Sequence, residues 1–284
     1  MDWLIDRTVR DVMGGSVFAL LPDSSQAAIS SLDEGTVREA ARQVHTRPLP
    51  GDWKHEKRLL LNPCLAVQWL SAFEELELPR ELRVYEPCAG GSDPVVIAAE
   101  IYSGGHGQYT TVNLNRILAA ELRGKVGKCR MNIEIIEDDA TANPHLPPDS
   151  ADVACFHHAV NDLLQTAVSE PRGMDTRSIE WWSNERQMIE WLEEDYLAGL
   201  LGERALPALL NAVSNATEIV RPGGYLLFDH WTWEGNRNSD WFPWQLFCDL
   251  IPMARELINS SDLPLQEVKL NGRDPQWWAC FQKK

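Results

Sequence analysis

The sequence has no long hydrophobic run. No stretch approaches the roughly 20 apolar residues that a helix needs to cross a bilayer. Residues 1 to 6 alternate between polar and apolar side chains and are acidic, unlike the basic start of a signal peptide. We therefore expect a cytoplasmic protein without a membrane partner.

Paired cysteines and positive charge are also scarce. The six cysteines are scattered and form no CxxC pair, so we expect reduced thiols and no metal site. The 26 lysine and arginine residues are outnumbered by 42 aspartate and glutamate residues, which gives a net charge of −16. Because an acidic surface repels phosphate groups, this charge predicts no nucleic-acid partner and no binding to anionic membranes.

What the sequence does contain is an alternation of strand and helix patterns. Such alternation predicts an α/β fold with a doubly wound, mostly parallel sheet of seven strands and an antiparallel C-terminal edge hairpin. We expect a helical N-terminal cap over residues 1–80 and a core over 81–284, with a helical insertion at about 165–205. The expected strands cover residues 82–86, 108–114, 132–136, 151–156, 225–229, 267–270 and 277–282.

Ligands of a doubly wound sheet bind beyond the carboxyl ends of its strands, so the residues that follow each strand are the candidates. The first strand is followed by small residues up to Ser92, which let the backbone approach a ligand closely. Asn113 ends the second strand, and Asp139 and Ala140 follow the third. A simple tight turn remains an alternative for the first of these loops.

These segments, in this order, resemble the class I S-adenosylmethionine-dependent methyltransferases. Glu86 and Gly90 match the acid and a glycine of that family's first motif, and residues 221–229 match its turn before the fifth strand. Cys88 and Ser92 stand where the family usually has glycine, and Asn113 stands where it usually has an acid. The resemblance implies S-adenosylmethionine as cofactor. The implied contacts are Glu86, Cys88, Ala89, Gly90, Asn113, Leu114, Asp139, Ala140 and His157.

The resemblance also implies a role for several of these residues. Glu86 would organise the loop and reach toward the amino group of the methionine moiety. Asn113 would replace the acid that binds the ribose hydroxyls, without its charge. Asp139 would accept a hydrogen bond from the adenine amine, and the Ala140 N–H would donate one to the ring.

Three histidines follow predicted strands. His157 and His158 follow the fourth strand together with Asp162, and His230 follows the fifth. Because histidine titrates near neutral pH, each is a candidate general base. We predict that His157, His158 or His230 is the catalytic base, which of them being open, with Asp162 as a candidate for the carboxylate that orients it. A structural or helix-capping role remains open for each histidine.

The sequence holds twelve tryptophans, several of them in clusters. Clustered aromatic rings on loops often line pockets for flat or cationic ligands. We predict substrate contacts by Trp53, Trp182, Trp231 and Trp233. The resemblance implies that residues 178–196, within the insertion, form a helical lid over the substrate. A solvated acidic helix remains an equal alternative for these residues, and it would pack Trp182, Ile189 and Leu192 inward.

The predicted function is methyl transfer from S-adenosylmethionine to an oxygen, nitrogen or carbon atom of a small molecule, as in secondary metabolism. The acceptor would be aromatic, apolar or cationic, and a homodimer remains open. Two alternatives use the same fold: an enzyme that handles this or a related nucleotide differently, and a non-catalytic scaffold. A nucleic-acid adenine methyltransferase is disfavoured, because residues 156–159 lack that group's Asn/Asp-Pro-Pro-aromatic motif.

Overall fold

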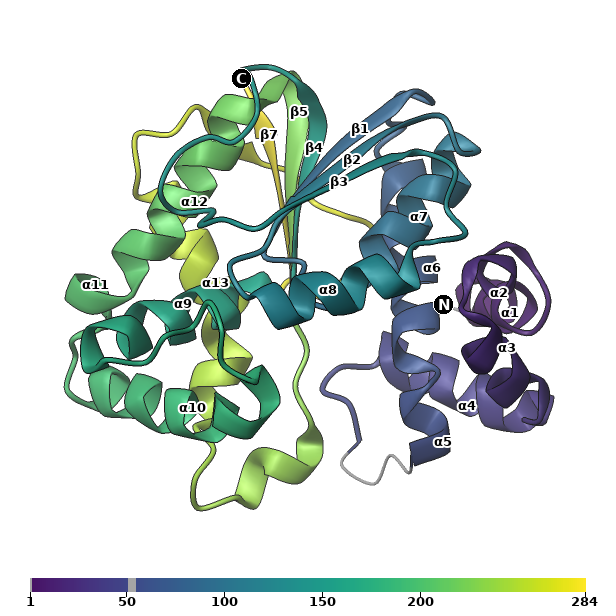
Figure 1. Ribbon diagram of the computed structural model, residues 1–284, viewed down its shortest axis with the longest axis horizontal. Coiled ribbons are helices and arrows are strands. Elements are labelled where there is room, and N and C mark those ends of the chain that lie inside the picture. Colours follow the sequence, from purple (N-terminus) through teal and green to yellow (C-terminus); the bar gives the residue numbers. More distant parts are fainter. Residues whose placement is uncertain (1, 51–54) are drawn as a thin grey trace.

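The computed structural model describes residues 2–50 and 55–284, without the side chains of residues 55 and 56. Its centre is a seven-stranded sheet in the order β3-β2-β1-β4-β5-β7-β6 (Figure 1). Strands β1 to β5 run parallel, and β7 is antiparallel to both β5 and β6. The predicted fold class is confirmed. The strands are β1 (Leu82–Pro87), β2 (Gly107–Val112), β3 (Asn132–Ile136), β4 (Ala151–His157), β5 (Val220–Asp229), β6 (Leu265–Glu267) and β7 (Trp278–Lys283).

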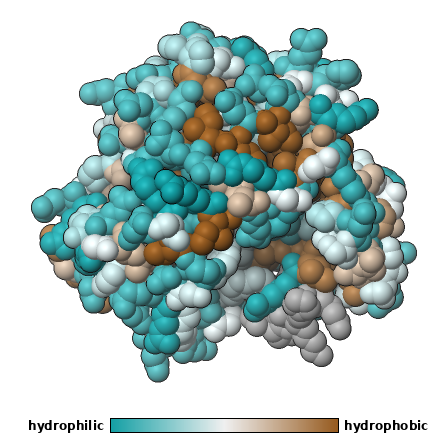
Figure 2. All heavy atoms as spheres, viewed as in Figure 1, coloured by the Kyte–Doolittle hydropathy of each residue, from teal (hydrophilic) through white to brown (hydrophobic). Residues whose placement is uncertain are grey.

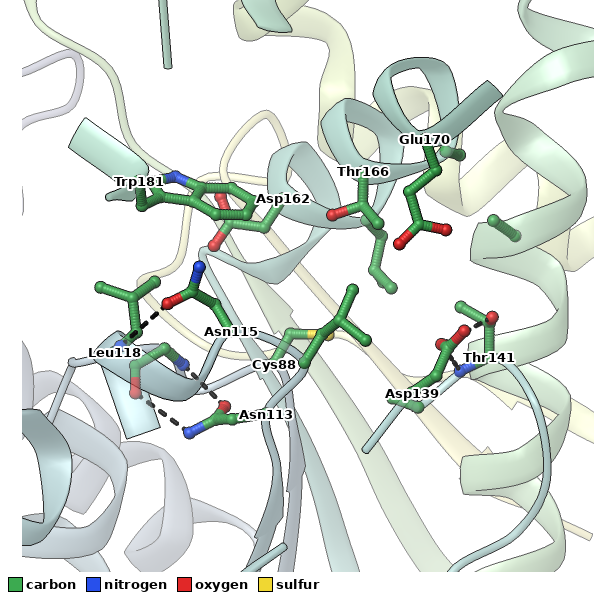
Figure 3. Close-up of a pocket in the computed structure, with 16 residues that line it drawn as sticks. Cys88, Asn113, Asn115, Leu118, Asp139, Thr141, Asp162, Thr166, Glu170 and Trp181 are labelled. Carbon is green, nitrogen blue, oxygen red and sulfur yellow. Dashed lines mark hydrogen bonds between the residues drawn. The ribbon is translucent and has the colours of Figure 1, made fainter. Parts of the chain in front are cut away.

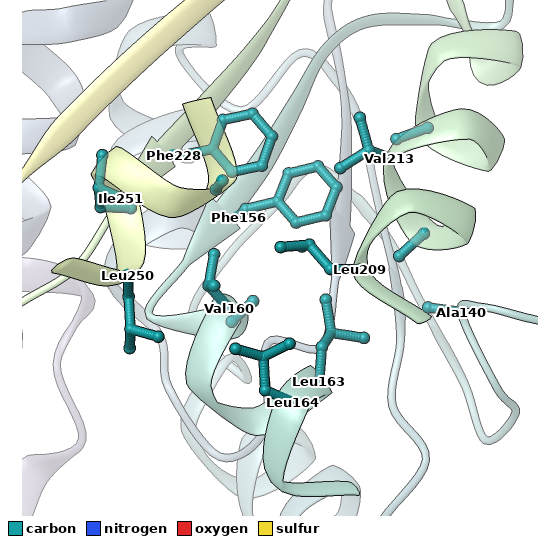
Figure 4. Packing of buried hydrophobic residues seen from close by; sticks show 14 of the residues in the cluster. Ala140, Phe156, Val160, Leu163, Leu164, Leu209, Val213, Phe228, Leu250 and Ile251 are labelled. Carbon is teal, nitrogen blue, oxygen red and sulfur yellow. The ribbon is translucent and has the colours of Figure 1, made fainter. Parts of the chain in front are cut away.

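Both faces of the sheet are covered by helices, which explains the continuous apolar run of β4. Phe156 packs against α9, α12 and α13 on one face (Figure 4), whereas Cys155 belongs to the cluster under α6 and α7 on the other. Successive side chains of a strand point to opposite faces, so both sets must be apolar. The core helices are α7 (Pro94–Ser103), α8 (Arg116–Lys125), α9 (Ala159–Ser169), α12 (Leu206–Ile219) and α13 (Trp244–Asn259).

The N-terminal part is helical and has its own apolar cluster, which includes Val12, Val37 and Leu65. Leu49 fastens this part to the chain that follows β5: its N–H donates to Thr232 O (2.8 Å), and its carbonyl accepts from Glu234 N (2.6 Å). The cap thereby reaches the carboxyl end of β5. The helices are α1 (Asp2–Val12), α2 (Ser16–Leu20), α3 (Asp23–Ser30), α4 (Glu34–His45), α5 (His55–Arg58) and α6 (Leu61–Glu75).

A helical segment lies between α9 and α12. Its main helix packs along α9 and presents Met188, Ile189 and Leu192 to the interior. Trp182 is instead 61% exposed, so the inward packing expected for this side chain is wrong. The helix begins at Trp181, and the side chains of neighbouring helical residues point in directions that differ by about 100°. Trp181 therefore faces the interior, whereas Trp182 faces solvent. The elements are η1 (Glu170–Arg172), α10 (Trp181–Leu197) and α11 (Leu201–Arg204).

Two strand boundaries differ from the sequence expectation. β5 begins at Val220 rather than at Tyr225, because residues before the expected start already pair with β4 across a register shift. β6 ends at Glu267, where the expected strand begins. Among the described residues, no helix is both long and apolar enough to cross a membrane. Most of the face in Figure 2 is hydrophilic, in keeping with the charge of −16, and hydrophobic atoms gather toward its middle.

Candidate functional site

A pocket lies at the carboxyl ends of β1, β2 and β3 and is closed on its other sides by α9 and the start of α10 (Figure 3). It encloses about 730 Å³, solvent at its mouth included, which is ordinary for a site that holds a small ligand. The lining residues come from six separate segments of the chain. They are Cys88, Gly90, Asn113, Leu114, Asn115, Leu118, Asp139, Ala140, Thr141, Asp162, Leu163, Thr166, Ala167, Glu170, Trp181 and Ala208.

The loop after β1 forms one wall of this pocket and has a constrained backbone. Cys88 (φ 61°) and Gly90 (φ 58°) both lie in the left-handed region, which is costly for cysteine. The loop is held by Asn113, whose Oδ1 accepts from Gly90 N (2.9 Å) and whose Nδ2 donates to Gly90 O (3.1 Å). Asn113 therefore lines the pocket with its amide already bonded to the loop.

Asn115 joins the pocket to the helical insertion, and sequence reasoning missed it. Its Oδ1 caps α8 by accepting from Ile117 N and Leu118 N, at 3.0 Å each. Its Nδ2 donates to Thr176 O and Ile179 O, at 2.9 Å each, and so fixes the segment that leads into Trp181. An asparagine just before a helical pattern is a capping signal, but its second set of bonds is long-range.

Asp139 and Ala140 line the opposite wall, after β3. Asp139 Oδ1 accepts from the backbone N–H and the hydroxyl of Thr141, both at 2.8 Å. The Ala140 carbonyl accepts from Asn215 Nδ2 of α12 (2.9 Å), which fixes the backbone at this point. Both residues stand where the sequence expects an adenine contact, and that role remains a prediction.

The pocket is acidic. Asp139, Asp162 and Glu170 line it, and among the described residues no lysine, arginine or histidine does. Burial and the nearby Glu185 raise the pKa of Asp162 well above its usual value. Carboxyl oxygens without a cationic partner favour ligands that are positively charged or rich in hydrogen-bond donors.

Glu86 lies beneath the pocket rather than in it. Its side chain is buried, its Oε2 accepts from the Tyr109 hydroxyl (2.5 Å), and its Oε1 has no partner among the described protein groups. Burial raises its pKa well above the usual value, against the effect of the Tyr109 hydrogen bond. Of the nine cofactor contacts expected from sequence, Glu86, Ala89 and His157 are not on the pocket wall.

The three histidines occupy two different environments. His157 is buried, and its Nδ1 lies 2.7 Å from Asp229 Oδ1 and 3.1 Å from Trp69 Nε1. His158 stacks between His230 and Trp231, with ring centroids 4.4 Å apart in each pair. Burial, with a smaller effect of His157, lowers the pKa of His158 to about 3.

The expected orienting carboxylate is wrong. Asp162 Oδ1 accepts from the amide of its neighbour Asn161 (2.6 Å) and bonds no histidine. The carboxylate that meets one of these three histidines is Asp229, the last residue of β5. Asp162 lies in the first turn of α9, five residues beyond the end of β4, and its side chain points into the pocket.

The tryptophans expected at a substrate lie in separate places where the structure describes them. Trp53 lies outside the described residues, and Trp182 is 61% exposed and not on the pocket wall, so its substrate contact stays a prediction. Trp231 and Trp233 pack edge to face, 5.4 Å apart, against the N-terminal cap. The tryptophan on the pocket wall is Trp181, which is 4% exposed.

The sheet order, the antiparallel C-terminal hairpin and the pocket beyond β1 to β3 together agree with the family that the sequence resembles. The fold is that of the class I S-adenosylmethionine-dependent methyltransferases. No protein-family model matches this methyltransferase-fold chain, and no curated protein sequence matches it.

Several solved structures align with the chain at low identity. PH0851 is 14% identical with a TM-score of 0.49, and the alignment covers 76% of this chain but only 45% of that one. A SAM-dependent methyltransferase from Aquifex aeolicus is 10% identical (TM-score 0.45, covering 75% and 87% of the two chains). A putative rRNA-methylase from Clostridium thermocellum is 12% identical (TM-score 0.44, covering 75% and 93%).

The last of these structures corrects one prediction. An rRNA-methylase aligns over three quarters of the chain, so the expectation of a small-molecule partner to the exclusion of nucleic acid is wrong. Net charge describes the whole surface, whereas a nucleic-acid contact needs only a local basic area. The acidity of the chain therefore does not exclude an RNA partner.

Proposed function

We propose that the chain is an S-adenosylmethionine-dependent methyltransferase. The observation that carries the proposal is the acidic pocket at the ends of β1 to β3, in a methyltransferase fold, which the described part of the chain lines without a cationic side chain. The cofactor offers an ammonium group, a sulfonium, ribose hydroxyls and an adenine amine, all of which suit carboxylate and amide oxygens. The proposed contacts on the wall are Cys88, Gly90, Asn113, Leu114, Asp139 and Ala140.

The residues of the chain would bind and orient this cofactor. Asp139 would accept from the adenine amine, and Asp162 would meet the donor groups nearer α9. Trp181, fixed through the contacts of Asn115, would cover the site and exclude water. When bound, S-adenosylmethionine supplies a methyl group: the acceptor atom bonds to the methyl carbon, and sulfur keeps the electron pair of the broken bond.

The proposal covers methyl transfer and leaves the acceptor open between a small molecule and RNA. The division into a cap over residues 1–80 and a core over 81–284 is part of the same proposal. Leu49 supports it, because this residue joins the cap to the end of β5, beside the histidines.

Calorimetric titration with S-adenosylmethionine and with S-adenosylhomocysteine tests the proposal. We expect binding of both ligands to the unaltered protein and a loss of at least tenfold in affinity for Asp139→Ala, which removes an acceptor from the wall. Glu134→Ala is the control, because this carboxylate of β3 is exposed and outside the pocket. Absence of binding to the unaltered protein would overturn the proposal and favour a different ligand or a scaffold.

A further inference from the structure

His157 makes two contacts at a single nitrogen that exclude each other. Nδ1 lies 2.7 Å from a carboxylate oxygen of Asp229 and 3.1 Å from the indole nitrogen of Trp69. A carboxylate can only accept, so the first contact needs a proton on Nδ1. The indole N–H can only donate, so the second contact needs a bare Nδ1. The charge state of Asp229 decides between them.

Arg47 fixes the charge of Asp229. Its Nη2 lies 2.8 Å from Asp229 Oδ2, and the two side chains are 3% and 0% exposed. Although burial opposes ionisation, His157 and Arg47 together lower the pKa of Asp229 to about 2. The carboxylate is therefore ionised at neutral pH, and Nδ1 of His157 must carry the proton. The remaining lone pair of the ring is then on Nε2.

Arg47 is itself held from several sides. It donates to Gln68 Oε1 of α6 (2.8 Å) and to the carbonyl of His230, and its guanidinium lies 5.2 Å from the ring centre of Trp278. Two residues later, Leu49 pairs with the chain after β5. The N-terminal cap therefore supplies a buried cation to the carboxyl ends of β4 and β5.

His157 ends the strand next to the one whose loop forms a wall of the proposed cofactor pocket. Tyr85 pairs with Ala154 in the parallel register of β1 and β4, so Pro87 and Phe156 are level with each other, and Cys88 and His157 each follow next in the chain. Cys88 lines the pocket, whereas Nε2 of His157 bonds no group in the described part of the chain. The free nitrogen is thus at the strand ends where methyl transfer is proposed.

The other candidates are less suited to take a proton. His158 and His230 are stacked face to face, and burial lowers both of their pKa values, that of His158 to about 3. Asp162, with its raised pKa, already accepts from Asn161. Of the four predicted catalytic residues, only His157 has a carboxylate partner to stabilise a positive charge.

We infer that Asp229 and Arg47 are positioning residues that hold His157 as its Nδ1–H tautomer, so that Nε2 receives the proton of the methyl acceptor. The inference rests on the proposed function and narrows the acceptor to a group that loses a proton, such as a hydroxyl or an amine. The acceptor's X–H bond would break, its proton would go to Nε2, and its electron pair would form the bond to the methyl carbon, while the methyl–sulfur bond breaks and leaves its pair on sulfur. The resulting imidazolium is stabilised by the ionised Asp229.

Long-range ¹H–¹⁵N correlation spectra of the full chain, labelled with ¹⁵N-histidine, test the positioning. His157→Gln identifies the His157 signals, and we expect the Nδ1–H tautomer near neutral pH. An Nε2–H tautomer, with Nδ1 accepting from Trp69, would overturn the inference. Asp229→Asn should abolish the fixed tautomer, since an amide can donate as well as accept. Asp152→Asn is the control, a buried carboxylate with two arginine partners at the opposite end of β4.

Addition of S-adenosylhomocysteine to the same sample tests the proton-acceptor role and needs no folded variant. The Nε2 resonance of His157 should move while its tautomer is kept. An unchanged Nε2 resonance in a sample that calorimetry shows to be saturated would overturn the role. If calorimetry shows no binding, both the proposed function and the proton-acceptor role of His157 are overturned. The measured tautomer of His157 still tests, by itself, whether Asp229 and Arg47 position the ring.

Discussion

Two regions at the carboxyl ends of the strands differ in how their charges are arranged. Beyond β1 to β3, three acidic side chains line an open pocket, and no cationic side chain of the described residues joins them on its wall. Beyond β4 and β5, the charges of Arg47 and Asp229 are paired and sealed beneath the N-terminal cap. Unpaired carboxyl groups at an open pocket are available to a ligand, whereas a sealed pair fixes the groups around it. We propose that the first region binds the cofactor and that the second positions His157.

Breaking the sealed pair should have the largest effect on stability. Asp229→Asn leaves Arg47 buried without its counter-charge, and we expect a loss of about 3–5 kcal/mol in the free energy of unfolding. Urea unfolding near pH 7 measures this loss. Asp152→Asn, whose arginine partners are 42% and 38% exposed, should lose only about 1 kcal/mol. Equal losses in the two variants would mean that burial beneath the N-terminal cap does not change the contribution of the Arg47–Asp229 ion pair to stability.

The open pocket can be probed with two adjacent tryptophans. Trp181→Ala removes a wall residue that is 4% exposed, and we expect a loss of about 3 kcal/mol in unfolding free energy together with weaker S-adenosylhomocysteine binding. Trp182→Ala removes a ring that is 61% exposed and should change stability by less than about 0.5 kcal/mol. Urea unfolding and calorimetry of both variants check this contrast; similar affinities would remove Trp181 from the site.

Much of the binding region could be predicted from the sequence, because local patterns define it. Apolar runs, small-residue loops and the residues after each strand follow periodicity and chain order, and six of the nine expected contacts lie on the pocket wall. The choice between Trp181 and Trp182 could not be predicted, since it depends on the helical phase at the first residue of α10.

The positioning region could not be predicted, because its partners are far apart in the chain. Arg47 and Asp229 are separated by 182 residues, and Trp69 and His157 by 88. Asp162, only a few residues from His157, was the natural local candidate for the orienting carboxylate. A short sequence distance places a residue on the next helical turn, but it does not direct its side chain back to the strand end.

As the pH falls, the buried His158 should destabilise the fold before Asp229 of the ion pair with Arg47 is protonated. The pKa of His158 is about 3 in the folded chain and about 6.5 when unfolded. The unfolded state therefore binds more protons below pH 6.5, and stability is lost as the pH falls through this range. At pH 5 the loss from His158 is about 2 kcal/mol.

A substitution at this position separates the histidine from other acid-sensitive groups. His158→Asn keeps a residue that tolerates φ 52° but removes the titrating ring. Between pH 7.5 and pH 5, its free energy of unfolding should fall by about 2 kcal/mol less than that of the unaltered protein. Urea unfolding at both pH values checks this difference, with the surface change His106→Asn as control. Parallel losses in the two proteins would contradict the buried, neutral state of His158.

The smallest expected effect concerns the residue that departs from the family pattern. Asn113→Asp restores the acid that methyltransferases usually carry after the second strand, yet a carboxylate cannot donate to Gly90 O as the amide does. We expect a loss of about 1 kcal/mol in unfolding free energy and no gain in affinity for S-adenosylmethionine, because the loop after β1 is no longer held from both sides. Asn132→Asp, at an exposed position of β3, is the control for the added charge. Tighter binding by Asn113→Asp would instead show that the ribose competes with Gly90 for the side chain at this position. The amide of Asn113 would then be a weaker form of the family's ribose contact, rather than a support of the loop after β1.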